Sequence, residues 1–202
     1  LLQPSWFASE FGMNRVVDAP KTTASVDESR QLVDLLNSKD EAGGTLLQRL
    51  HRDALTRFCF GYLGRIEEAE DAVQEIFLKV VQATTVPEHF RPWLYKVARN
   101  HCLKCAQRMR GRDGQIQQPS QIPEAMTGQL TRLVNNEAQA RMAEAFAALS
   151  DDQREVLRLR YAENLSRGEI AEVLDMTESL VKSRLFEGLK KLREVAARLE
   201  SR

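Results

Sequence analysis

Apolar residues recur every three or four positions through most of this chain, which is the spacing of one face of an α-helix. The spacing predicts helices from residue 25 to the Gly43–Gly44 pair, and at about 45–63, 67–83 and 92–110. A second helical block is expected from about residue 130 to the C-terminus. No segment alternates apolar and polar residues between turn signals, as a half-buried strand would. We therefore expect an all-α protein.

Local start and stop signals refine these helices. The segment ATTVPEHFRP, residues 83–92, contains Pro87 and Pro92 and is expected to be a loop. A serine three residues before a glutamate or glutamine has the spacing of a capping box, which marks a helix start. Such pairs are Ser25 and Glu28, Ser150 and Gln153, and Ser166 and Glu169.

Two stretches lack a helical pattern and divide the chain. The segment 111–136 contains GRDGQIQQPSQIPEAMTGQ, has few large apolar residues, and is expected to be a flexible linker. Residues 1–25 form a tail, and we expect Met13 to be the native start after a non-native LLQPSWFASEFG. The prediction is two small helical domains, 26–110 and 137–202.

Composition narrows the class of protein. The chain has 202 residues, 43% of them hydrophobic, and a formal net charge of zero, which fits a soluble globular protein. Its apolar runs are far shorter than the roughly 20 residues that span a bilayer, and no signal segment opens it. Three cysteines, an odd number, fit a reducing compartment. We expect a cytoplasmic location and no membrane span.

The predicted helix at 67–83 has two different faces. Its apolar stripe is Ala69, Val73, Ile76 and Val80, and the opposite side carries Asp71, Gln74, Glu75 and Leu78. An apolar residue within an acidic surface suits docking against a basic protein element, with Leu78 and the neighbouring Phe77 as anchors. The alternative is a solvated acidic face, which is what charge runs usually are.

The predicted helix at 92–110 combines a buried stripe with residues suited to single-stranded nucleic acid. An aromatic, a cation and an amide offer a stacking surface, a phosphate contact and a reader of base edges. These residues are Trp93, Lys96 and Asn100, with Arg99 beside them and Phe90 and Arg91 extending the surface. The alternative is that Trp93 belongs to the core and is half-buried.

The C-terminal helices predict a helix-turn-helix. The apolar pattern breaks only at Asp175, Met176 and Thr177, and so short a turn forces a steep crossing. In the last helix Val181, Leu185, Leu189, Leu192 and Ala196 share one face, whereas Ser183, Phe186, Glu187 and Lys190 point away. Lys182 and Arg184 are placed to hold phosphates, and Ser183 and Phe186 to meet bases. An ordinary helical hairpin with a basic face is the alternative.

The segment HCLKC places His101, Cys102 and Cys105 close together, which resembles half a zinc site. The other half is missing, because Cys59 and His51 are isolated in the sequence. Cysteines in this position are expected to be small buried hydrophobes, and a thiol redox role is the alternative. We therefore predict no metal site and no cofactor.

Together these segments resemble the extracytoplasmic-function (ECF) sigma factors, the small two-domain group of the bacterial sigma-70 family. The resemblance rests on EEAEDAVQEIFLKVV, then FRPWLYKVARNHCLK, a proline-containing linker, and LSDDQREVLRLRYAENLSRGEIAEVLDMTESLVKSRLFEGLKKLR, and it covers about residues 26–199. It implies sigma region 2 at 26–110 and sigma region 4 at 137–202. It also implies a dissociable subunit that catalyses nothing itself, the polymerase performing nucleotidyl transfer.

The resemblance assigns partners to each surface. Core RNA polymerase would be bound through its β′ clamp helices by Asp71, Gln74, Glu75, Phe77 and Leu78, and through its β flap by region 4. The loop at 84–92 would open the promoter −10 element, whose bases would meet Phe90, Arg91, Trp93, Lys96, Arg99 and Asn100. The −35 element would meet Thr177, Lys182, Ser183, Arg184, Phe186, Glu187 and Lys190. The linker would run toward the RNA exit path, and an anti-sigma factor is a possible further partner.

Two residues depart from the family pattern. Family members often carry a basic residue where this chain has Glu187, and an acid there accepts from a cytosine amino group or points away. Asp175 stands where the family's turn often has glycine, but aspartate tolerates the left-handed conformation. The rival functions are a helix-turn-helix regulator that binds palindromic DNA as a dimer, and a sigma mimic that titrates a regulator.

Overall fold

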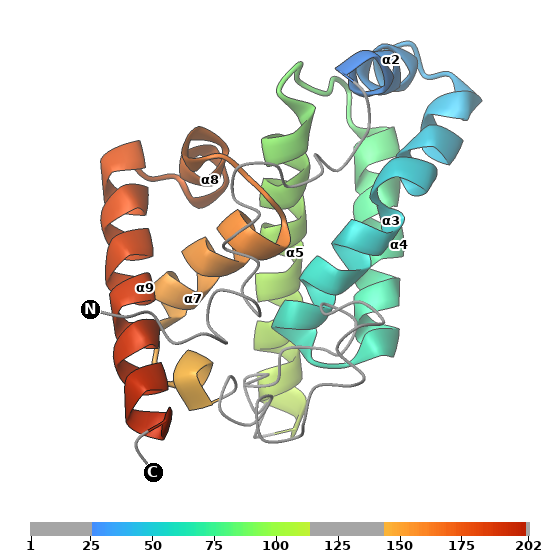
Figure 1. The fold of residues 1–202 in the computed structure, drawn as a ribbon. Coiled ribbons are helices and arrows are strands. Elements are labelled where there is room, and N and C mark those ends of the chain that lie inside the picture. Colours follow the sequence, from blue (N-terminus) through green and yellow to red (C-terminus); the bar gives the residue numbers. More distant parts are fainter. Residues whose placement is uncertain (1–25, 114–143, 201–202) are drawn as a thin grey trace. The chain divides into compact units, whose positions relative to one another are not determined.

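A computed structural model describes residues 26–113 and 144–200 (Figure 1). Every regular element in these two ranges is a helix, which confirms the all-α prediction. The described helices fall into two compact units, one containing α2 to α5 and the other α7, most of α8, and α9. The predicted tail with Met13, the Ser25 cap, linker residues 114–136 and the helix start near residue 130 lie outside the described residues.

The first unit consists of four helices. They are α2 (Val26–Asn37), α3 (Glu41–Leu63), α4 (Ile66–Gln82) and α5 (Phe90–Asp113). Helix α3 packs against α2, α4 and α5, so it lies at the centre of the unit. Large side chains that lose all contact with water fill the space between these helices, as their helical spacing predicts; they include Leu32, Leu47, Leu55, Phe58, Ile76 and Leu94.

The expected end of the first helix at Gly43 and Gly44 is wrong. Helix α2 already ends at Asn37, Lys39 takes a left-handed φ of 59°, and Asp40 caps α3 by accepting a 2.8 Å hydrogen bond from the Ala42 N–H. Both glycines therefore lie in the first turn of α3. A Cβ at Gly43 would lie 3.2 Å from the α2 backbone at Leu35, so glycine here permits close helix packing rather than a break.

The expected loop at 83–92 is shorter in the structure. Helix α5 begins at Phe90, so Pro92 lies in its first turn rather than in the loop. Proline is tolerated there because the first N–H groups of a helix have no intrahelical acceptor. At its other end α5 continues to Asp113, so the backbone of residues 111–113 is helical and not part of a linker.

The second unit contains α7 (Asp151–Leu157), a π-helical turn η4 (Arg158–Ala162), α8 (Arg167–Leu174) and α9 (Glu178–Glu200). Both predicted capping boxes, at Ser150 and Ser166, are formed. Asp175 is the C-cap of α8 and adopts the left-handed φ and ψ of 53° and 48° that its residue type tolerates. Helix α9 packs closely on α7, because a Cβ at Gly188 would lie 3.0 Å from Leu157 Cδ1.

No helix within residues 26–113 and 144–200 is both long enough and apolar enough to cross a bilayer.

Candidate protein and nucleic-acid interfaces

Helix α4 has the two faces that its spacing predicts. Ala69, Val73, Ile76 and Val80 are buried against the rest of the unit. The opposite side, which we call the acidic face, consists of the exposed residues Asp71, Gln74, Glu75 and Leu78. Leu78 is 57% exposed, an unusually large apolar surface to leave in water between carboxylates.

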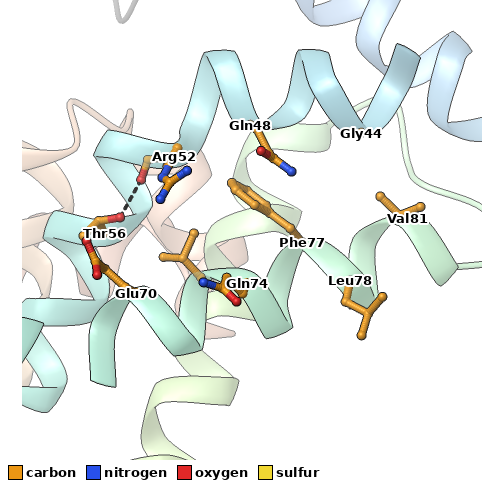
Figure 2. Close-up of a pocket in the computed structure, with 10 residues that line it drawn as sticks. Gly44, Gln48, Arg52, Thr56, Glu70, Gln74, Phe77, Leu78 and Val81 are labelled. Carbon is orange, nitrogen blue, oxygen red and sulfur yellow. Dashed lines mark hydrogen bonds between the residues drawn. The ribbon is translucent and has the colours of Figure 1, made fainter. Parts of the chain in front are cut away.

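Beside the acidic face lies a hollow of about 470 Å³ between α3 and α4 (Figure 2). The two helices run antiparallel because only Gly64 and Arg65 separate them. Each helix supplies residues spaced four apart, so the two walls run along the helix axes. The α4 wall is Glu70, Gln74 and Leu78, and the α3 wall is Gln48, Arg52 and Thr56.

The α3 wall is the part of this surface that sequence reasoning missed. Gln48, Arg52 and Thr56 form a polar stripe at helical spacing, which is a visible signal. The stripe gives no indication of its neighbour, however, because any solvated helix face has the same pattern. Only the packing of α3 on α4 brings it beside the acidic face.

Phe77 was predicted to lie on the surface with Leu78, but it is buried. Its side chain is only 7% exposed and lines the hollow, and Figure 2 shows the ring directed from α4 toward α3. The reason is geometric: residue 77 is one position from Ile76, on the edge of the buried stripe, whereas residue 78 is 100° further round. Phe77 therefore forms part of the buried lining of the hollow.

Phe90 also lies elsewhere than expected, since it is 4% exposed and belongs to the core rather than to an exposed surface. Its ring packs 5.7 Å from the His51 ring and 5.9 Å from the Trp93 ring. Burial, with a smaller effect of Arg91, lowers the pKa of His51 to about 4, so this imidazole is neutral at pH 7. Phe90, the first residue of α5, thus packs against an uncharged imidazole in the core.

The remaining residues of the predicted nucleic-acid stripe follow α5 toward solvent. Trp93 is half-buried, the intermediate position that the alternative for this residue allowed. Lys96 and Arg99 are also half-buried, and Asn100 is exposed. Arg91 lies with its guanidinium 6.0 Å from the centre of the Tyr95 ring. The structure therefore keeps these side chains along one helix, but with a smaller accessible aromatic surface than expected.

The outward side of α9 carries five exposed residues, which we call the recognition face: Lys182, Ser183, Phe186, Glu187 and Lys190. Phe186 is 66% exposed. Ser183 Oγ donates a 3.1 Å hydrogen bond to Glu187 Oε1, so these two side chains lie side by side. Thr177 precedes the helix and accepts a 3.3 Å hydrogen bond from the Leu180 N–H, as an N-cap does.

Arg184, which the sequence predicts to flank the outward side of α9 and to hold phosphate, is engaged with α7 in the structure. Its guanidinium forms a 2.7 Å ion pair with Asp152 on α7 and also lies 3.7 Å from the sulfur of Met176. These contacts direct its charge toward the body of the unit, where it joins α9 to α7. Sequence spacing places Arg184 beside the reading side but does not show the carboxylate that attracts it.

The HCLKC segment lies within α5. Cys102 is fully buried, and Cys105 Sγ lies 3.3 Å from His101 Nε2. Burial raises the pKa of Cys105, which keeps it in the less reactive thiol form. Across the part of the chain that the structure describes, no three or more His, Cys, Asp or Glu side chains are arranged to hold a metal ion.

Two family models match the chain, each in one half. The model for sigma-70 region 2 matches residues 47–112, within the unit that carries the acidic face. The model for sigma-70 region 4 matches residues 139–192, which include the helix-turn-helix and the recognition face. The two matches occur in the order predicted from the sequence.

Curated relatives extend across both halves. ECF RNA polymerase sigma factor SigL of Mycobacterium tuberculosis is 33% identical over 153 residues, which cover 71% of this chain and 82% of SigL. ECF RNA polymerase sigma factor SigW of Bacillus subtilis is 26% identical over 163 residues, covering 72% and 84%. The solved structure of CnrH in complex with the cytosolic domain of CnrY shares the fold, with a TM-score of 0.62, 21% identity and coverage of 86% and 98%. With both sigma-70 regions present and relatives of this extent, the chain belongs to the ECF RNA polymerase sigma factors of the sigma-70 family.

Proposed function

We propose that this sigma factor uses three separate surfaces to direct RNA polymerase to promoters: the acidic face for core polymerase, the start of α5 for the −10 element, and the recognition face for the −35 element. The observation that carries the proposal is that each half exposes an apolar residue among charged ones, negative in the first half and positive in the second. Leu78 lies among carboxylates, and Phe186 lies beside Lys182 and Lys190.

The acidic face is proposed to bind the β′ clamp helices of core polymerase. Fully burying an exposed leucine contributes about 1.5–3 kcal/mol, and Leu78, which is 57% exposed, can gain roughly half of that. The surrounding carboxylates favour a basic partner and speed its association. Gln74 and Leu78 are shared between the acidic face and the hollow, so a partner helix that covers Leu78 also reaches the α3 wall. Phe77 would then contribute by keeping Leu78 in place rather than by direct exposure.

The α4–α5 loop and the first turns of α5 are proposed to capture unpaired bases of the −10 non-template strand. The loop exposes Thr84, Thr85 and Glu88, and the helix that follows presents Lys96 and Asn100. Single-stranded recognition needs cations near phosphates, hydrogen-bonding side chains and a stacking surface. Phe90 would act here from the core, holding the half-buried Trp93 at the surface.

The recognition face is proposed to enter the major groove of the −35 element. Lys182 and Lys190 are suited to phosphates, Ser183 and Glu187 to base edges, and Phe186 to a thymine methyl. Because the net charge of the whole chain is zero, little counterion release is available, and the free protein is expected to bind duplex DNA weakly. Region 4 would also contact the β flap, which fixes its distance from region 2.

Cooperation between the halves explains why the polymerase is needed. Two weak modules held at a set separation bind as one, since the second contact becomes intramolecular. Melting the −10 element costs several kcal/mol, which the combined contacts offset. Sigma factors are not enzymes, and we propose that nucleotidyl transfer is left entirely to the polymerase, in the cytoplasm.

A regulatory protein is a further proposed partner. CnrH, which shares this fold, was solved in complex with the cytosolic domain of CnrY. An anti-sigma factor acting on this chain would prevent initiation if it covered the acidic face. That role would suit a partner with basic residues around an apolar pocket for Leu78.

Run-off transcription with purified core polymerase tests the proposed function. Addition of the chain is expected to start transcripts at discrete promoters, mapped by their 5′ ends. Binding of the chain alone to a palindromic site as a dimer would support the rival function, a helix-turn-helix regulator. That rival is not favoured, because the chain matches both sigma-70 regions. Association with core polymerase without any initiation would support the sigma mimic.

A further inference from the structure

The α4–α5 loop is fastened to the end of α2 by one asparagine. Asn37 Nδ2 donates a 3.1 Å hydrogen bond to the Val86 carbonyl, and the Val86 N–H donates a 2.8 Å hydrogen bond to Asn37 Oδ1. One carboxamide therefore satisfies both backbone groups of the middle residue of the loop, as a neighbouring strand would. The side chain of Val86 is buried, at 2% exposure.

A lysine two residues later contacts the start of the same loop. Lys39 Nζ donates a 3.3 Å hydrogen bond to the carbonyl of Val81 and another to that of Ala83. The Val81 carbonyl is among the last of α4, which have no intrahelical N–H and favour a cation, and Ala83 is the C-cap residue that follows the helix. Lys39 reaches them from a left-handed backbone conformation, with φ of 59°.

Together the two side chains hold the loop at its beginning and its middle while leaving its other residues free to bind. Thr84, Thr85, Pro87 and Glu88, on either side of Val86, remain exposed. A loop in which one residue is fixed and its neighbours are open has lost much of its conformational freedom before any ligand arrives. Such preorganisation improves affinity by lowering the entropy cost of binding.

We propose that Asn37 and Lys39 are positioning residues for promoter opening, because they hold the α4–α5 loop in the conformation that takes up bases of the −10 non-template strand. The inference rests on the proposed function of that loop. Neither residue touches DNA in this account, and both act through the backbone of residues 81–86. The asparagine and lysine lie outside the region 2 match, which begins at residue 47.

The test uses holoenzyme assembled from core polymerase and full-length chain. A single-stranded −10 oligonucleotide and a scrambled one of equal length are titrated, and permanganate reactivity of −10 thymines reports opening on duplex promoter. Asn37→Ala and Lys39→Gly are expected to reduce the preference for the −10 sequence by roughly tenfold, a loss of one or two hydrogen bonds, with association to core polymerase unchanged. Lys39→Arg, which keeps a cationic donor, is expected to restore the preference.

Ser38→Ala is the matched control, because Ser38 lies in the same turn but donates its hydrogen bond to Leu35 within α2. Lys39→Gly keeps the test valid if Asn37→Ala fails to fold, since glycine adopts the positive φ without steric strain. Thr85→Ala with Glu88→Ala, in the exposed loop, tests the function on which the inference rests. Unchanged preference in that loop variant would overturn the proposed function. If the loop variant loses its preference for the −10 sequence while Asn37→Ala and Lys39→Gly keep theirs, this inference alone is overturned. A loss in Ser38→Ala equal to that in Asn37→Ala and Lys39→Gly would also overturn it.

Discussion

Arg184 Nη2 lies 2.7 Å from Asp152 Oδ2, so the helix that carries the recognition face is joined to α7 by a pair of opposite charges. The arginine is 25% exposed and the aspartate 59%, and pairs at this exposure contribute at most about 1 kcal/mol. We expect Arg184→Asp to weaken holoenzyme binding to a −35 promoter by up to about fivefold. Adding Asp152→Arg should restore most of that binding, measured by competition at fixed salt.

Lys182→Asp serves as the comparison for this charge exchange. If Lys182 contacts phosphate, as proposed, Asp152→Arg should not rescue its loss, because the two residues share no contact. Failure of the exchange to rescue Arg184→Asp would contradict the action of Arg184 through Asp152 and favour the direct DNA contact that the sequence predicted.

The acidic face should be required for association with core polymerase. Asp71→Arg combined with Leu78→Ala replaces an attractive charge by a repulsive one and removes the exposed apolar anchor. An interface hot spot contributes about 2 kcal/mol or more, and we expect the two changes together to reach that value, so affinity for core polymerase should fall by at least roughly 30-fold. Because both side chains are exposed, the melting temperature of the free chain should hardly change.

A matched variant, Asp53→Arg with Leu103→Ala, makes the same kinds of change at exposed positions of α3 and α5. It should bind core polymerase as the natural chain does. Equal affinity of the two double variants would remove the acidic face from the interface.

The neighbouring glycines of α3 should respond oppositely to alanine. At Gly44 a Cβ would meet only Val81 Cγ2, at 3.9 Å, so Gly44→Ala should stabilise the helix by about 0.5–1 kcal/mol. At Gly43 it would press on the α2 backbone at 3.2 Å, and Gly43→Ala should destabilise the unit by roughly 1 kcal/mol. Urea unfolding of both variants measures the difference, and similar signs would contradict the close packing of α2 on α3.

His51 should make stability depend on pH. Its pKa falls from 6.5 to about 4 on folding, so the unfolded chain binds the proton between these values and the folded chain does not. The contribution of roughly 3 kcal/mol is present above pH 6.5 and is lost as the pH falls toward 4. His101, whose pKa burial also lowers, acts in the same direction.

The contribution of His51 is isolated by comparing the chain with His51→Phe. Unfolding free energies measured in urea from pH 7 to pH 4.5 should fall less steeply for the variant, which cannot take up the proton. Parallel curves for the two proteins would assign the pH dependence to other groups.

The spacing of residues three or four positions apart was sufficient to predict many local features of this protein. It predicted the two faces of α4, the capping boxes at Ser150 and Ser166, and the buried positions Val181, Leu185 and Leu192 of α9. The family resemblance placed Asp175 at a turn position, where aspartate tolerates the left-handed conformation that is observed. These features depend on the geometry of one helix or one turn, which a short stretch of sequence contains completely.

Contacts between distant segments required the tertiary structure. Gly43 lies inside α3, where the missing Cβ lets α2 pack closely across it, and Phe77 and Phe90 are buried because neighbouring helices cover the edges of their stripes. Asn37 and Val86 are 49 positions apart, and Arg184 and Asp152 lie on different helices. Local periodicity predicts which side of a helix is buried. The residues that this side contacts depend on how the helices pack together, and helix packing involves all the helices of the unit at once.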